Sequence, residues 1–258
     1  KTGMMNLSSI FVSHFHADHF LGIPGLIQTM SFMGRKDPLL IYGPEGTREF
    51  TELFKALGYF NLKYEVQGIQ LKPGDVVERE QYVIRALKTE HSISSLGYAL
   101  IENPRPGRFN REKAIELGIP PGPLFAKLQK GNKVEVNGKT VKPEDVMGNL
   151  RPGRTVVYSG DTRPCKPVLE ASRDADVLIH DGSFADEMAD WAEESKHSTA
   201  GEVAALAKEA KVRSLVLTHI SSRYTDDVEP LLTDSKKVFE NVIIAEDLME
   251  IEVPYRSK

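Results

Sequence analysis

Cysteine is nearly absent from this sequence: among its 258 residues only Cys165 carries a thiol. No disulfide can form within the chain, which excludes disulfide-stapled folds and favours a reducing compartment. Long hydrophobic runs are also missing, and none approaches the roughly 20 apolar residues that a membrane-spanning helix needs. The first residues, Lys1–Leu7, lack the apolar core of a signal peptide. We therefore expect a cytoplasmic protein with no membrane partner.

The composition is that of an ordinary globular protein, with 40% hydrophobic and 27% charged residues. These values exclude collagen-like, disordered and coiled-coil chains. The length suits a single α/β domain over residues 1–258. Strands are predicted at residues 9–13, 39–42, 64–67, 81–87, 97–101, 155–158, 177–180 and 214–218. Helices are predicted at 20–33, from 47 to 57, and near 165–173, 184–193 and 198–210. The alternation of strands and helices in the second half predicts a layered α/β fold.

The net charge of −4 conceals an asymmetry. Residues 103–154 hold eleven basic and five acidic side chains, a balance of +6, which leaves −10 for the remainder. A basic segment on an acidic body indicates an appended nucleic-acid contact. A solvated loop with a chance surplus of lysine and arginine is the alternative.

Three of the seven histidines fall with an aspartate in the six-residue motif His14-Phe-His-Ala-Asp-His19, directly after a predicted strand. In an extended turn, His14 and His16 point to the same side, while Asp18 and His19 reach a second point as the helix begins. One loop can therefore ligate two metal ions. Neutral imidazole and carboxylate are ligands that suit zinc and related divalent ions.

Three further candidate ligands, His91, Asp161 and His219, also follow predicted strands. Side chains past the carboxyl ends of strands gather at one edge of a layered α/β fold. With the motif, they make seven ligands, five histidines and two aspartates. An aspartate between two ions can bridge them, and two ions roughly 3.5–4 Å apart are typical of two-metal hydrolases.

His197 lies at a predicted helix N-terminus, with Ser198 or Thr199 as the N-cap. It is not needed to complete the seven ligands, so we interpret it as a candidate general acid that protonates a leaving oxygen. A merely exposed histidine is the alternative. His180 is interpreted as a structural hydrogen-bonding residue.

At these residues the sequence resembles the metallo-β-lactamase superfamily and, within it, the ribonuclease Z family of tRNA 3′-processing endonucleases. The motifs that resemble the family span nearly the whole chain in family order. They are Leu21-Gly-Ile-Pro-Gly-Leu26, His91-Ser-Ile-Ser-Ser-Leu-Gly-Tyr98, Pro120-Pro-Gly-Pro123, Ser159-Gly-Asp-Thr-Arg-Pro164, His197-Ser-Thr199 and Leu217-Thr-His-Ile-Ser-Ser-Arg-Tyr224.

The resemblance implies an αβ/βα four-layer sandwich that binds two Zn2+ per subunit, or Mn2+ or another divalent ion in their place. The implied ligands of one ion are His14, His16 and His91, and those of the other are Asp18, His19 and His219, with Asp161 as the bridge. Asp18 would also accept a proton from the attacking water. His197 would donate one to the leaving 3′ oxygen.

The resemblance further implies that residues 103–154 form an inserted basic arm, or exosite, that grips the elbow of precursor tRNA. The implied substrate-binding residues are Gly122, Pro123, Lys127, Lys130, Ser198 and Thr199. Family members act as homodimers, so we expect a homodimer here.

Two departures from the family pattern stand out. Family members carry a longer segment before the histidine motif, whereas 13 residues precede His14 here. We therefore expect the first strands of one sheet to be missing from this chain. At Asp181 the family usually has an acidic residue with a longer side chain.

Two other functions remain open on the sequence. One is a hydrolase of the same fold that acts on a small phosphodiester or thioester, which would need no distant basic segment. The other is a nucleic-acid-binding protein with a structural metal site, but such sites are usually four-coordinate and rich in cysteine.

Overall fold

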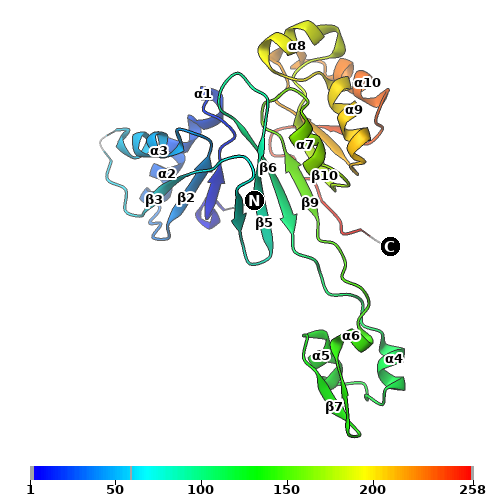
Figure 1. Ribbon diagram of the computed structural model, residues 1–258. Coiled ribbons are helices and arrows are strands. Elements are labelled where there is room, and N and C mark those ends of the chain that lie inside the picture. Colours follow the sequence, from blue (N-terminus) through cyan, green and yellow to red (C-terminus); the bar gives the residue numbers. More distant parts are fainter. Residues whose placement is uncertain (1–2, 59, 257–258) are drawn as a thin grey trace. The chain divides into compact units, whose positions relative to one another are not determined.

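The computed structural model describes residues 3–58 and 60–256, and the chain forms two compact units (Figure 1). The large unit comprises the residues up to Ile101 and those from Arg154 onward. The small unit is the segment between them, Glu102–Gly153.

The first sheet of the large unit has three parallel strands in the order β1-β2-β3. Their bounds are Ser9–Phe11, Leu39–Gly43 and Val66–Gln70. Helices α2 and α3, Gly22–Phe32 and Thr47–Ala56, cover one face of this sheet (Figure 1). Ile27, Met30 and Phe54 are almost fully buried in that layer, which makes the helices and the sheet one hydrophobic core.

The helix predicted over residues 20–33 is two helices, a short α1 over Ala17–Phe20 and then α2. Pro24 explains the break, because it has no N–H to donate to the carbonyl one turn earlier and is tolerated only in a first helical turn. Leu21, which lies between the two helices, keeps helical dihedral angles and donates its N–H to the carbonyl of Ala17 at 3.0 Å.

The second sheet has seven strands in the order β12-β11-β10-β9-β6-β5-β4. Strands β9 to β12 run parallel, whereas β6 pairs antiparallel with β9 and β4 with β5. The bounds of β4, β5, β6 and β9 are Val76–Glu78, Tyr82–Lys88, Leu96–Glu102 and Thr155–Tyr158. Those of β10, β11 and β12 are Val177–Asp181, Leu215–Thr218 and Val242–Ile244.

Helices cover the outer face of this sheet (Figure 1). The bounds of α7, α8, α9 and α10 are Lys166–Ala171, Ala189–Ser195, Ala200–Ala210 and Glu229–Lys236. Single 3-10 turns lie at Met4–Asn6, Asp186–Met188 and Ser222–Tyr224. The helix predicted to start near residue 184 starts later, because Phe184 is extended and forms a bridge with Thr199.

Aromatic side chains fill the space between the two sheets. Phe11 of the first sheet stacks on Tyr42 at 4.7 Å and meets Tyr98 of the second sheet edge-on at 5.2 Å. The layers are thus helices, sheet, sheet and helices. The predicted αβ/βα four-layer sandwich is confirmed.

The small unit has its own core, with Ile119 and Leu128 fully buried. It contains helices α4, α5 and α6, Arg111–Glu116, Pro123–Gln129 and Pro143–Val146, and the hairpin of β7 and β8, Val134–Val136 and Lys139–Val141. Its basic side chains therefore project from a folded element. Within the described part of the chain, no helix is long and apolar enough to cross a membrane.

Candidate metal centre

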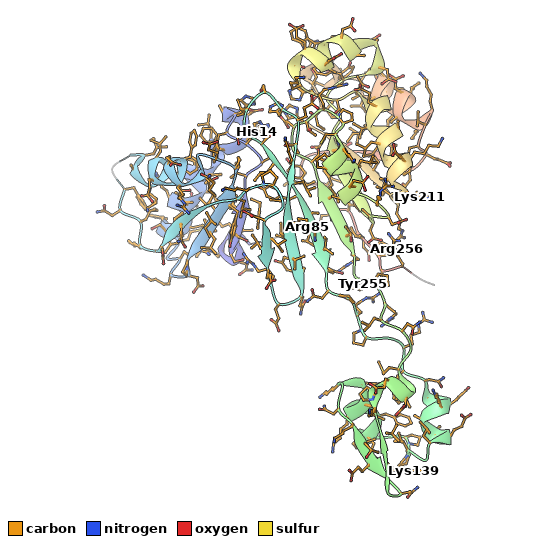
Figure 2. All side chains as sticks on the ribbon, in the orientation of Figure 1. His14, Arg85, Lys139, Lys211, Tyr255 and Arg256 are labelled. Carbon is orange, nitrogen blue, oxygen red and sulfur yellow. The ribbon has the colours of Figure 1, made fainter. Side chains whose placement is uncertain are left out.

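The loop between β1 and α1 carries the histidine motif, and Figure 2 labels His14 in it. His14 is fully buried, and Ser13 Oγ lies 3.1 Å from its Nδ1. Tyr98 donates its hydroxyl proton to the carbonyl of Val12 at 2.6 Å, which ties the start of the loop to the second sheet. The ring of His14 is therefore fixed before any ligand binds.

Three ring nitrogens meet at one side of this loop. His14 Nε2 lies 3.0 Å from His16 Nδ1, which lies 3.2 Å from His91 Nε2. His91 is held from behind, because its Nδ1 lies 3.1 Å from the carbonyl oxygen of Lys196. That contact assigns the proton to Nδ1 and leaves the lone pair of Nε2 facing the other two rings.

A second group forms where α1 begins. Asp18 Oδ2 lies 3.4 Å from His19 Nε2 and 3.7 Å from His219 Nε2. His219 follows β11 with a φ of +57°, a left-handed conformation that is uncommon outside glycine. Ser183 Oγ accepts from its Nδ1 at 2.9 Å, so the strained backbone and this bond aim Nε2 at Asp18.

Asp161 lies between the two groups. Its Oδ2 is 3.6 Å from His14 Nε2, 3.2 Å from His19 Nε2 and 3.3 Å from His219 Nε2. The preceding Gly160 has a φ of +63° and passes so close to Ser13 that an added Cβ would lie 2.7 Å from the Ser13 Cβ. The sharp turn that delivers Asp161 therefore requires glycine.

The side chains of the cluster have the protonation states that metal ligands need. Burial lowers the pKa of His14 to about 3, which keeps its imidazole neutral. Burial alone would raise the pKa of Asp161, but the hydrogen bond from His19 and the charges of the nearby histidines lower it to about 2. Burial also lowers the pKa of His91. Neutral imidazole and ionised carboxylate are the forms that bind metal ions.

The nitrogen positions fit a divalent cation. Two nitrogens bound to one tetrahedral zinc at 2.0–2.1 Å lie about 3.4 Å apart, close to the spacing of the three-histidine group. His16 Nδ1 faces two other ring nitrogens, and it can make a hydrogen bond with only one of them. The seven predicted ligands form three overlapping groups, and within each group the ligand atoms lie within 4.8 Å of one another. The groups are His14, His16 and His91; His14, His19 and Asp161; and Asp18, His19 and His219. The structure thus brings all seven predicted ligands together.

His197 lies beside this cluster, with its Nδ1 2.8 Å from Asp181 Oδ2. Burial disfavours its charged form, but the hydrogen bond to Asp181 outweighs burial and raises the pKa of His197. Its ring stacks on that of His219 at 5.0 Å. Its ligand atom also lies within 4.8 Å of those of His91 and Asp161, so geometry alone leaves a ligand role open.

Sequence reasoning missed Ser183. Its hydroxyl donates to Asp181 Oδ1 at 2.7 Å and accepts from His219, so it joins the His197 pair to the cluster. Nothing in the local pattern distinguishes this serine, and its position two residues past β10 is the only available signal. His180 is buried, with its Nδ1 2.9 Å from the carbonyl oxygen of Asp181, which agrees with a structural role.

The predicted substrate residues divide between the two units. Ser198 and Thr199 are buried in the large unit: Ser198 Oγ donates to the carbonyl of Thr162 at 2.6 Å, and Thr199 caps α9. Their hydroxyls therefore hold the loop that carries His197, and substrate contact by them stays a prediction. The others lie in the small unit at and after the start of α5, namely Gly122, Pro123, Lys127 and Lys130.

A four-layer sandwich with such a histidine and aspartate cluster at its strand ends defines a protein of the metallo-β-lactamase fold. A sequence profile of the beta-lactamase superfamily domain matches residues 124–220. Human tRNase Z, short form, has a solved structure that matches with a TM-score of 0.65 and 26% identity, over 98% of this chain and 81% of that chain.

Curated relatives narrow the class. Ribonuclease Z of Methanosarcina acetivorans is 85% identical over 256 residues, which are 99% of this chain and 84% of that protein. Ribonuclease Z of Methanosarcina mazei is 84% identical over the same length, with the same coverage. The chain belongs to the ribonuclease Z family.

Proposed function

We propose that this chain is a metal-dependent endoribonuclease that removes the 3′ trailer from precursor tRNA and leaves a 3′ hydroxyl on the tRNA. The observation that carries the proposal is the convergence of seven histidine and aspartate ligands around Asp161 in a member of this family. Two Zn2+ ions per subunit suit this donor set, and Mn2+ is an alternative. The single cysteine of the chain supports a cytoplasmic site of action.

Divalent ions in this cluster would neutralise charge on the scissile phosphate and activate the attacking water. His14, His16 and His91 would hold one ion, and Asp18, His19 and His219 the other, with Asp161 between them. Most of these side chains are fixed by contacts inside the protein. Asp18 differs, because 69% of its side chain is exposed, so it faces the open side of the cluster. That placement lets its carboxylate accept the proton of the attacking water.

His197 is the proposed general acid. Its Nδ1 proton is committed to Asp181, so Nε2 is the atom that would donate a proton to the leaving 3′ oxygen. Asp181 is fully buried and also accepts from the backbone N–H groups of Thr162 and Ser183, at 3.1 and 3.0 Å. The shorter aspartate can therefore orient the imidazole, because neighbouring backbone groups fix its carboxylate.

The small unit would capture the tRNA. Lys127 and Lys130 lie exposed on and after α5, where lysine charges give affinity for phosphates independent of sequence. Recognition by shape suits a folded RNA. Gly122 and Pro123 start α5. We further propose a homodimer, in which the small unit of one subunit serves the metal cluster of the other.

The test is cleavage of an end-labelled precursor tRNA with a 3′ trailer by the zinc-loaded protein, with and without a chelator. We expect one chelator-sensitive cut after the discriminator base. Hydrolysis of a small phosphodiester without any cut in the tRNA would contradict the proposal and favour the small-substrate hydrolase.

A further inference from the structure

Arg163 lies two residues after Asp161 and reaches the loop of His197. Its Nη1 donates to the carbonyl oxygen of His197 at 2.6 Å and to Glu202 Oε2 at 2.8 Å. Its Nη2 forms a second ion-pair contact with Glu202 Oε1. Only 15% of the Arg163 side chain is exposed, so water competes little for these bonds. A guanidinium that grips a carboxylate with two nitrogens is fixed in direction as well as in position.

Glu202 extends this contact to the start of α9. Its Oε2 accepts from the backbone N–H of Thr199 at 2.9 Å, while its own N–H donates to Thr199 Oγ1 at 3.3 Å. This reciprocal capping box fixes the first turn of the helix. One carboxylate therefore joins Arg163 to the residues that directly follow His197.

The other side of Arg163 is tied to a loop of the metal cluster. Its backbone N–H donates to the carbonyl of Glu90 at 2.9 Å, and the N–H of Glu90 donates to Thr162 Oγ1 at 2.9 Å. Glu90 directly precedes His91. The loops that carry His91, Asp161 and His197 therefore meet at Arg163.

The loop of His197 is also held by backbone bonds, such as the one from the His197 N–H to the carbonyl of Ala192 at 2.8 Å, but Arg163 is the side chain that bonds to the carbonyl of His197 itself. Lys196 precedes it in a left-handed conformation with a φ of +61°, and it lies between α8 and α9 outside any strand. Arg163 contacts the carbonyl of His197 and not its ring. We infer that Arg163 is a positioning residue, which holds the His197 imidazole at the cluster. This inference rests on the proposed function, in which His197 is the general acid.

The experiment compares Arg163→Ala and Arg163→Lys with the wild type on two substrates. Precursor tRNA has a poor leaving group that needs a proton, whereas bis(p-nitrophenyl) phosphate has a good leaving group that does not. We expect Arg163→Ala to lower kcat on precursor tRNA about 10- to 100-fold, a part of the 10²–10⁴-fold contribution of a general acid. KM, metal content and hydrolysis of the small substrate should change little. Arg163→Lys should recover only part of the loss in kcat. Its ammonium group keeps the positive charge, but it cannot hold both Glu202 and the His197 carbonyl as the planar guanidinium does.

Two further variants separate positioning from folding. Arg173→Ala removes an exposed arginine that pairs with Glu170 at 2.8 Å, and it should change neither activity. Glu202→Gln keeps the size of the side chain but removes the charge that pairs with Arg163. It should lower kcat on precursor tRNA, as Arg163→Ala does. In a His197→Ala background, Arg163→Ala should cause no further loss. Equal losses on both substrates, or losses that multiply in the double variant, would overturn the inference.

A readout independent of catalysis is the low-field proton resonance of the His197 Nδ1–H that bonds to Asp181, assigned by its absence in His197→Ala. We expect Arg163→Ala to broaden or remove it, and an unchanged resonance would overturn the inference. A wild-type protein that leaves precursor tRNA uncut would instead contradict the proposed function, and this resonance would still decide the role of Arg163.

Discussion

The two units of this chain use their polar residues in opposite ways. In the large unit, histidines and aspartates converge at the ends of buried strands, and His14 and Asp161 are almost inaccessible to water. In the small unit, most basic side chains stand exposed around a core of its own. Catalytic groups need fixed geometry and shifted pKa values, which burial provides. Capture of a polyanion needs exposed charge on a folded support, so a thin core is enough.

The comparison predicts that the largest effect comes from the centre of the buried cluster. Asp161→Asn removes the carboxylate charge that lies within 3.6 Å of three histidines. We expect metal content and activity on both substrates to fall by roughly 10²-fold or more, because removal of mere supporting partners already costs 10–100-fold. Metal analysis and kinetics measure this. A variant that keeps its metal and turns over normally would contradict the role of Asp161 as a metal ligand.

The next effect separates chemistry from metal binding within the large unit. His197→Ala should lower precursor-tRNA cleavage by about 10²–10⁴-fold, the usual contribution of a general acid. Metal content and tRNA binding should stay nearly unchanged. Loss of metal in this variant would instead make His197 a ligand, as its distance to His91 and Asp161 allows.

A smaller effect is expected in the small unit. The double variant Lys127→Ala, Lys130→Ala should raise KM for precursor tRNA several-fold and leave kcat and the small substrate unchanged. The salt dependence of binding should weaken by a slope of about 1 for each lysine that contacts a phosphate. Lys36→Ala, Lys208→Ala removes two exposed lysines of the large unit and is the matched control. An equal effect of both pairs would mean that only net charge matters.

The smallest effect concerns stability of the large unit alone. Asp176 accepts from the N–H of Thr155 at 2.9 Å and pairs with Arg213 at 3.2 Å and with Arg256, labelled in Figure 2, at 3.0 Å. Burial opposes ionisation, but these bonds outweigh it and lower the pKa of Asp176. We expect Asp176→Asn to lower the free energy of unfolding at neutral pH by about 1–3 kcal/mol.

The pH dependence of that loss has a definite sign. A carboxyl with a lowered pKa in the folded state stabilises the fold above its unfolded pKa, and this contribution fades as the pH falls below about 4. The stability gap between wild type and Asp176→Asn should therefore narrow in acid. Denaturation at several pH values measures this, and a gap that widens in acid would contradict the assigned bonds.

Much of the fold follows from local sequence patterns. Strands such as Val177–Asp181 are short apolar runs, and Thr199 with Glu202 is a capping signal visible in the sequence. The short edge strands β4 and β12 were not predicted, because their few apolar residues pack through partners distant in sequence. The elements of the small unit were not predicted either, although the Asn137-Gly138 turn between β7 and β8 is a local hairpin signal.

In the candidate site, the metal ligands could be predicted from the sequence, but the residues that hold them in place could not. The crowded motif from His14 to His19 has no packing purpose, so it predicts ligands. Ser183 and Arg163 act through bonds to residues up to 39 positions away in the sequence. Local sequence patterns cannot predict such contacts, because they reflect only neighbouring residues. The inward direction of Ser198 and Thr199 likewise depends on tertiary structure.

The most direct test of this division of labour removes the small unit. Ile101 and Thr155 are paired across β6 and β9, so an Asn-Gly turn in place of residues 103–153 can close the two strands as a hairpin. The shortened protein should keep its metal and its activity on bis(p-nitrophenyl) phosphate and lose efficient cleavage of precursor tRNA. Undiminished tRNA cleavage would contradict the account.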